Sequence, residues 1–200
     1  MMRTLAKAVI ALLSITSGFA AGAEKTFQAG APEKYSHQEG EQVVVGAQAF
    51  ESAEQTKPVF GKKVDLNRYG VLPVLLVIKN NRSKALDLNG IDVKLVPKEG
   101  KSVIPIEPGD VASIAKPVKS PNVNSSPIPH IHKDPMDSLA IVERAFVAKI
   151  VPPGQQVSGF FYFQAHPEPG LKFLVQGIFE RASGKQIVYF EIPLSSGNSE

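Results

Sequence analysis

Two histidines and a methionine in the second half of the chain are the first residues with the capacity for metal chemistry. His130 and His132 stand two positions apart, and Met136 follows four positions later. Side chains at i and i+2 of an extended chain point to the same side, so both imidazoles can bind one ion. Imidazole with thioether suits copper, which predicts a copper site at His130, His132 and Met136. The alternative is a pair of solvated histidines, because no third ligand stands at a recognisable spacing.

Nucleophilic and acid–base catalysis have no matching pattern in this sequence. The chain has no cysteine, and Ser158 lacks the glycine two positions upstream that a nucleophile elbow requires. The aspartates are dispersed and form neither a paired-carboxylate site nor a calcium loop. We therefore expect a protein that is not an enzyme and that has no cofactor other than the copper considered above. The rival is an enzyme whose catalytic residues converge only in three dimensions.

Four consecutive aromatic residues, Phe160 to Phe163, mark a predicted strand. Alternation puts Phe161 and Phe163 on one face of it, and Phe160 and Tyr162 on the other. If the first face belongs to the core, Phe160 and Tyr162 either form an apolar surface for a partner or are covered by another element. The short helix predicted over residues 134–144 and the loop before it would provide this cover.

The N-terminus has the pattern of a cleavable export signal. Two cations precede a short apolar run, which is followed by small residues. Ala21 and Ala23 provide the small side chains at −3 and −1 that signal peptidase requires, so cleavage is predicted between Ala23 and Glu24. The apolar run is shorter than the roughly 20 residues that cross a bilayer. Residues 1–23 are therefore predicted to be a signal peptide.

An exported chain without cysteines has no disulfides, which favours a bacterial periplasmic or secreted protein over a eukaryotic secretory one. Removal of Arg3 and Lys7 with the signal leaves 20 of the 22 basic residues against 19 acidic ones, a net charge of +1. No basic stripe with interleaved aromatics is present, so nucleic acid is not expected as a partner. No second apolar stretch reaches membrane-spanning length, so we expect no spanning segment in the mature chain.

The remainder of the chain consists of short apolar segments separated by turns. Residues 71–80 are the strongest, with both alternating sets apolar, which is typical of a strand buried on two faces. Further strands are predicted at 42–48, 91–96, 102–106, 146–150, 156–163, 171–179 and 186–192. This spacing predicts a mainly β fold, an antiparallel immunoglobulin-like β-sandwich with one short helix and a long proline-rich loop over 116–135. A small closed barrel is the alternative.

The predicted organisation has four parts. The signal peptide, 1–23, is followed by a flexible lead-in at 24–40, a β-sandwich domain at 41–194, and a disordered tail at 195–200.

Two of the predicted strands resemble those of a known group of proteins. The segment Tyr69–Asn81 holds an apolar Pro-Val strand that ends in asparagine, and Pro153–Phe163 holds a Pro-Gly turn and a Ser-Gly pair before the aromatic strand. Both resemble strands of uncharacterised bacterial exported proteins with an immunoglobulin-like sandwich. The resemblance covers residues 42–193, implies the scaffold alone, and brings no known activity or site residue.

These observations predict an exported, non-catalytic domain that binds an envelope protein or an apolar or peptidic ligand. The loop over 116–135 and the surface at Phe160 and Tyr162 would form the recognition site. The alternatives are a periplasmic copper protein that uses His130, His132 and Met136, and a structural envelope component. The sequence does not define the oligomeric state.

Overall fold

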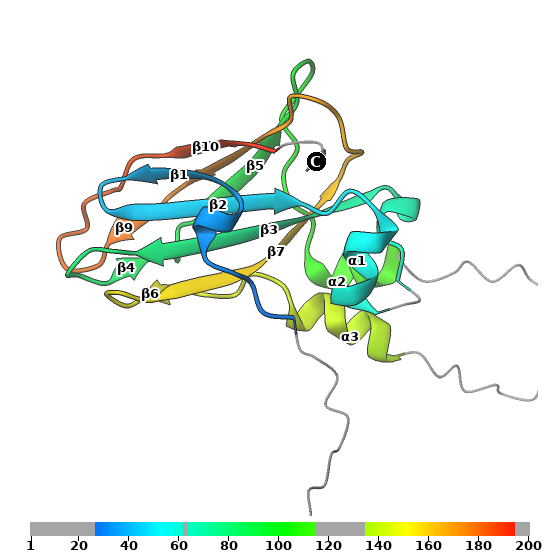
Figure 1. The fold of residues 1–200 in the computed structure, drawn as a ribbon, viewed down its shortest axis with the longest axis horizontal. Helices are drawn as coiled ribbons and strands as arrows, with labels where there is room; N and C mark the ends of the chain where they lie inside the picture. The colour runs from blue at the N-terminus through cyan, green and yellow to red at the C-terminus, as the bar shows by residue number, and fades with distance from the viewer. Residues whose placement is uncertain (1–26, 62–63, 115–134, 195–200) are drawn as a thin grey trace, which may run out of the picture.

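The structure is a computed structural model that describes residues 27–61, 64–114 and 135–194. The predicted mainly β class is confirmed: every named strand pair is antiparallel, and the packing of the sheets is consistent with a β-sandwich (Figure 1). The four-stranded sheet has the order β1 (Ser36–Gly40), β2 (Val43–Ala49), β3 (Val71–Asn80), β7 (Gln156–Gln164). The two three-stranded sheets have the orders β10 (Phe190–Pro193), β8 (Lys172–Gln176), β5 (Asp92–Val96), and β6 (Ile150–Val151), β4 (Leu86–Asp87), β9 (Phe179–Glu180).

Strand β3 is the centre of the molecule, and it is buried on both faces as its apolar composition predicts. Leu72, Leu76 and their even-numbered neighbours face a core cluster shared with strands β2, β4, β5, β8 and β10. Leu75 and Val77 face a second cluster on the other side of the sheet. Because β3 contributes alternate side chains to both clusters, it joins the sandwich core to the layer that covers the sheet's outer face.

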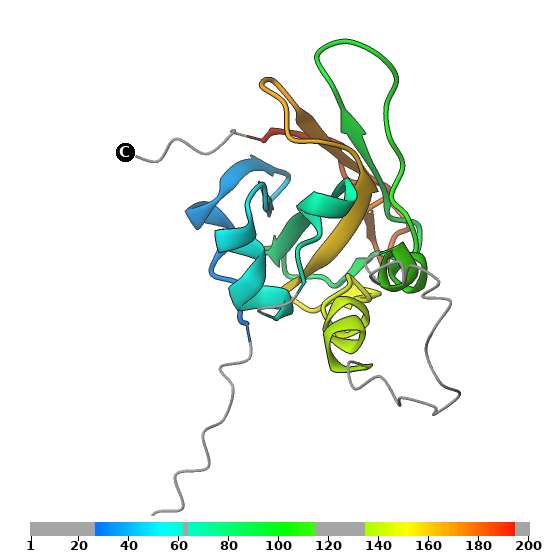
Figure 2. The same cartoon turned by 90° about the vertical axis from the view of Figure 1, so that its right-hand side faces the viewer.

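That covering layer is helical and gathers at one end of the four-stranded sheet (Figures 1 and 2). The sequence predicts one short helix, and α3 (Pro135–Glu143) is found there; α1 (Ala53–Phe60) and α2 (Pro108–Ile114) are two more. Two 3-10 turns complete the described helical elements, η1 (Pro32–Lys34) and η2 (Asn67–Tyr69). Helix α1 contains Pro58 and continues through it to Phe60, although proline usually ends a helix.

Two features explain why α1 continues past its proline. A capping box fixes the start, with the Gln55 N–H donating to Ser52 Oγ at 3.4 Å and the Ser52 N–H donating to Gln55 Oε1 at 3.2 Å. At the other end, Val59 and Phe60 are buried in the second cluster. Burial of these two apolar side chains outweighs the single helical hydrogen bond that proline removes.

The flexible lead-in predicted over 24–40 is wrong in its second half, where β1 pairs with β2 from Ser36 to Gly40. The strand is polar and largely exposed, so it has no apolar period to reveal it. The sequence also gives no sign of the hairpin turn. Glu41 and Gln42 adopt positive φ angles of 47° and 62°, at positions where Asn-Gly is the usual pair. Pairing with a buried neighbour specifies this strand.

Four of the predicted strands are shorter than expected. The 171–179 segment is divided into β8 and β9 at Gly177, whose φ angle is 78°. The 102–106 segment forms isolated bridges to Leu95 and Tyr162, the 146–150 segment is a ladder only from Ile150, and the last strand is limited to 190–193. The predicted tail, 195–200, lies outside the described residues. In the described part of the chain, no helix combines the length and apolar character needed to cross a membrane.

Candidate ligand-binding cleft

The predicted partner surface at Phe160 and Tyr162 is not a surface, because the two side chains are only 2% and 1% exposed. The helical layer covers them: the Phe60 ring centroid lies 4.9 Å from that of Phe160. The Tyr162 hydroxyl donates to the Ile141 carbonyl at 2.7 Å, and burial raises the pKa of Tyr162. The covering by a helix weighed above is what the structure shows, and the binding-surface prediction for these two residues is corrected.

The other predicted site residues are not assembled by the described structure. His130, His132, Ala23 and Glu24 lie outside the described residues, as does the loop between α2 and α3. Met136 is the second residue of α3, described there by its backbone alone. Among the described residues, no group of three His, Cys, Asp or Glu side chains could hold a metal. The copper site and the cleavage site stay predictions.

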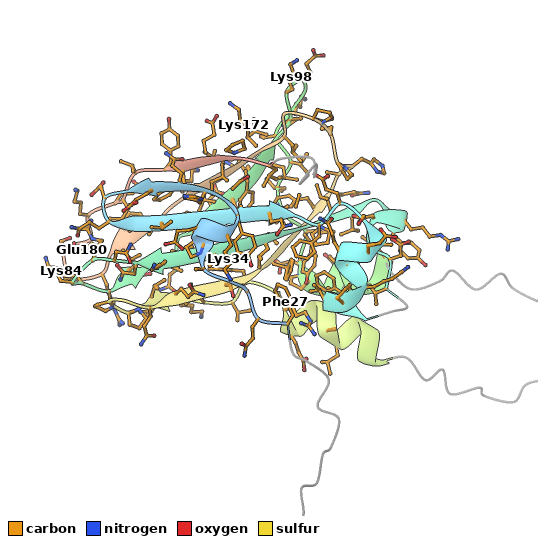
Figure 3. The ribbon with its side chains drawn as sticks, in the orientation of Figure 1. Phe27, Lys34, Lys84, Lys98, Lys172 and Glu180 are labelled. Carbon is orange, nitrogen blue, oxygen red and sulfur yellow. The ribbon has the colours of Figure 1, made fainter. Side chains whose placement is uncertain are left out.

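A cleft of about 390 Å³ opens where the N-terminal segment, the end of α3 and strand β7 meet. Phe27, labelled in Figure 3, belongs to its wall. The other lining residues come from the last residue of α3, from the segment after it and from the adjacent strands β3 and β7: Leu75, Glu143, Arg144, Ala145, Val147, Ser158, Gly159 and Phe160. We call this site the β7 cleft.

Aromatic packing holds the N-terminal wall of the β7 cleft in place. The ring centroid of Phe27 lies 6.3 Å from that of Phe50, in an edge-to-face arrangement, and 5.6 Å from that of Phe160. Such pairs add to the stability that area burial alone provides. The first described residue is therefore anchored on the second core cluster rather than free.

The opposite wall is held by backbone hydrogen bonds between the end of α3 and β7. The Phe160 N–H donates to the Arg144 carbonyl at 2.8 Å, and the Phe146 N–H donates to the Phe160 carbonyl at 2.9 Å. The approach is so close that a Cβ at Gly159 would stand 2.5 Å from the Phe146 Cα. Glycine in the Ser-Gly pair is therefore a packing requirement of the cleft wall.

Part of the outer edge of β7 is open inside the cleft. Successive residues of an antiparallel strand direct their backbone N–H and C=O groups to opposite edges. The backbone groups of Ser158 therefore lie on the same edge of β7 as those of Phe160, the edge away from β3. The groups of Phe160 are taken by Arg144 and Phe146. In the described part of the chain, no backbone group forms a hydrogen bond with the N–H or C=O of Ser158 on this edge. The side chain of Ser158 is exposed. The cleft thus contains free hydrogen-bonding positions of a sheet edge.

The side chains around this open edge combine apolar contact with charge. Val147 is 75% exposed and is the most exposed of the large apolar side chains described. Arg144 is half-buried, and its Nε is enclosed without a hydrogen-bond partner among the described residues. Glu143 beside it is exposed. No histidine is among the described lining residues, so Ser158 has no imidazole base beside it there. This lining is suited to recognition.

A second cluster of charged residues joins the loops at the far end of the sandwich, where Figure 3 labels Lys84 and Glu180. Glu180 is only 5% exposed and accepts hydrogen bonds from Arg82 at 2.5 Å, Lys84 at 2.9 Å and Ser183 at 2.8 Å. The hydrogen bonds from Arg82, Lys84 and Ser183 lower the pKa of Glu180 to about 2. Arg82 also donates to the Glu41 carbonyl at 2.8 Å. Through Arg82, this cluster fastens the strained turn at Glu41 to the neighbouring loops, and the Nε of Arg82 is the one atom of that guanidinium enclosed without a partner among the described residues.

Comparison with known proteins yields one structural likeness to report. No protein-family model matches the chain, and no curated protein matches it. The fold is similar to the crystal structure of ycdA from Bacillus subtilis subsp. subtilis str. 168, provisionally described as a lipoprotein, with a TM-score of 0.38 and 11% identity. The match covers 80% of this chain and 38% of that one, so this chain spans well under half the length of the neighbour.

Sequence reasoning missed the β7 cleft because its walls meet only in three dimensions. Phe27 falls in the predicted lead-in, and Arg144 closes the predicted helix without any motif around it. Only Val147 could have been recognised from the sequence. The alternation over 146–150 places its apolar side chain on the outward side of the predicted strand, together with Lys149. An apolar residue at a solvent-facing position is what a binding surface requires.

Proposed function

We propose that this chain is an exported, immunoglobulin-like sandwich domain that binds an extended peptide segment of an envelope protein in the β7 cleft. The observation that carries the proposal is the open backbone at Ser158, set beside the exposed side chain of Val147. An extended segment can add to such an edge by main-chain hydrogen bonds, while side chains at the rim select the sequence.

The dimensions and rigidity of the site support a binding role. A cleft of about 390 Å³ lies within the range of ligand sites, roughly 300–1,000 Å³. Its base is the β3–β7 ladder, which pairs without a break from Val71–Gln164 to Lys79–Gln156. An edge on a fixed ladder is already ordered before a ligand arrives, which reduces the entropic cost of binding.

Peptide selection on the mature protein tests this function. Peptides selected from a displayed random library on residues 24–200 should bind wild type and bind Val147→Asp on the order of 10-fold more weakly, because the variant places a charge in the apolar contact. Ile104→Asp is the matched control, since Ile104 is 66% exposed and lies outside the cleft. Equal binding to all three proteins, or no selected peptide, would contradict the proposal.

A backbone variant tests the mode of binding. Ser158→Pro removes the N–H directed into the cleft and leaves the bonds of the neighbouring residues to β3 in place. The selected peptides should lose most of their affinity for this variant, with a circular dichroism spectrum like that of wild type. Full retention of affinity would exclude strand addition.

Export is tested separately. Mass spectrometry of the protein recovered from the cell envelope should give an N-terminus at Glu24, because Ala21 and Ala23 suit signal peptidase. Recovery of the intact chain from Met1 in a membrane fraction would contradict this part of the proposal.

A further inference from the structure

We infer that the peptide bound in the β7 cleft ends there, and that its free C-terminal carboxylate is bound by Arg144. This inference rests on the proposed function and adds the chemistry of the ligand. It follows from two features, the closed end of the β7 edge and the cationic side chain of Arg144 that lines the cleft beside it.

The closed end is formed by the pairing of Phe160. Its N–H and C=O are bonded to Arg144 and Phe146, so the edge is already occupied at that position. An added strand can pair beside Gln156 and Ser158 but cannot continue past Phe160. The bound segment therefore has to terminate or turn away next to Arg144.

The positive charge of Arg144 at this closed end determines which terminus of the bound peptide lies there. Arg144 is the one cationic side chain among the described residues that line the cleft, and it is only partly buried. Its Nε is enclosed, so a ligand contacts the guanidinium through its terminal nitrogens. A carboxylate satisfies a guanidinium by two parallel hydrogen bonds. The neighbouring carboxylate of Glu143 would favour an ammonium instead, but Glu143 is exposed and its field is screened by water.

The direction of the bound strand follows from this choice. A strand whose C-terminus lies at the Phe160 end runs in the same direction as β7, which makes the added pairing parallel. The antiparallel alternative would bring an N-terminal ammonium next to Arg144, where the two cations repel.

Two forms of one probe peptide test the inference. The probe is Thr-Val-Thr-Val-Thr-Val with fluorescein on its N-terminus, made with a free carboxylate and with a carboxamide, and binding to residues 24–200 is followed by fluorescence anisotropy. We expect wild type to bind the acid form about 10-fold or more tightly than the amide, because a hydrogen bond to a charged group is lost in the amide.

Variants assign that preference to one side chain. Arg144→Gln should bind both forms with the affinity that wild type has for the amide, and Arg144→Lys, which keeps the charge but not the planar fork, should retain part of the preference. Lys149→Gln is the matched control, because Lys149 is exposed and does not line the cleft. It should keep the full preference.

The outcomes separate the two proposals. If wild type binds acid and amide equally, or if Arg144→Gln keeps the preference, the carboxylate inference is wrong and peptide binding stands. If neither form binds while the library selection above succeeds, a chain end is not the ligand and the inference is again overturned. If both experiments yield no binding, peptide binding itself fails and the inference fails with it.

Discussion

At the scale of the residue, Gly159 is the position where the wall of the cleft depends on the absence of a side chain. Gly159→Ala would place a Cβ 2.5 Å from the Phe146 Cα and 2.7 Å from its N, both backbone atoms that cannot move aside cheaply. Overpacking of this kind costs about 1–3 kcal/mol of the free energy of unfolding, which urea titration measures. Gly109→Ala is the control, since no described atom outside its chain neighbours and its own helix backbone lies within 4 Å of its Cβ position. Equal stability of the two variants would contradict the packing argument.

The lowered pKa of Glu180 predicts how the free energy of unfolding changes at acid pH. Its hydrogen bonds from Arg82, Lys84 and Ser183 lower the pKa of the carboxyl from the usual 4.5 to about 2. Because the folded-state pKa lies below the unfolded one, the stabilisation is complete above pH 4.5 and is lost as the pH falls toward 2. Glu180→Gln should therefore lose less stability than wild type over this interval, as urea unfolding at several pH values will show. Parallel pH dependence in the two proteins would contradict this role.

The residue scale also shows what the sequence could not predict. Glu180 is bound by Arg82 and Lys84, which are nearly a hundred positions away, so no local pattern marks the cluster. Arg144 and Phe27 meet in the same way, across the fold. Spacing rules detect sites whose ligands share one strand, helix or loop, as His130 and His132 would.

At the scale of the element, a strand could be predicted from the sequence where its apolar residues follow a regular pattern. Strand β3 is evident from sequence because its residues are apolar on both alternating sets, and both faces are buried. Strand β1 has polar side chains and an exposed face, so only its pairing with β2 defines it. Helix α1 has a capping box at Ser52 and Gln55 that the sequence contains, but Pro58 obscures the helix, whose last two residues are stabilised by burial in the assembled fold.

A buried hydroxyl contacts the last turn of helix α3. The last carbonyls of a helix have no partner within it, and Tyr162 satisfies that of Ile141 at 2.7 Å. Tyr162→Phe should lower the free energy of unfolding by about 1 kcal/mol and speed hydrogen exchange of the α3 amides more than that of β8. Tyr189→Phe is the control, because Tyr189 is 60% exposed. Unchanged exchange in α3 would show that the hydroxyl does not hold the helix.

At the scale of the whole molecule, the sandwich core and the helical layer share strands β3 and β7, which contribute side chains to both core clusters. The mainly β class was predictable because strands with alternating apolar residues have to bury one face against another sheet. The helical layer was not predicted as a layer, since its cover of Phe160 and Tyr162 requires α1, α2 and α3 from three distant parts of the chain. The β7 cleft lies where that layer ends, so it exists only in the assembled fold.

The position of β3 between the two clusters predicts cooperative unfolding. Leu75 and Leu76 are adjacent in β3 and are 1% and 0% exposed, but Leu75 packs in the helical cluster and Leu76 in the sandwich core. Replacement of either by alanine should cost about 2–5 kcal/mol, and because β3 pairs with both β2 and β7, each change should weaken both clusters together. Hydrogen exchange should then report one denaturant midpoint for α3 and β8 in both variants, lower than in wild type. If Leu75→Ala instead releases α3 at a denaturant concentration that leaves β8 protected, the helical layer is a separate unit and β3 does not couple the two.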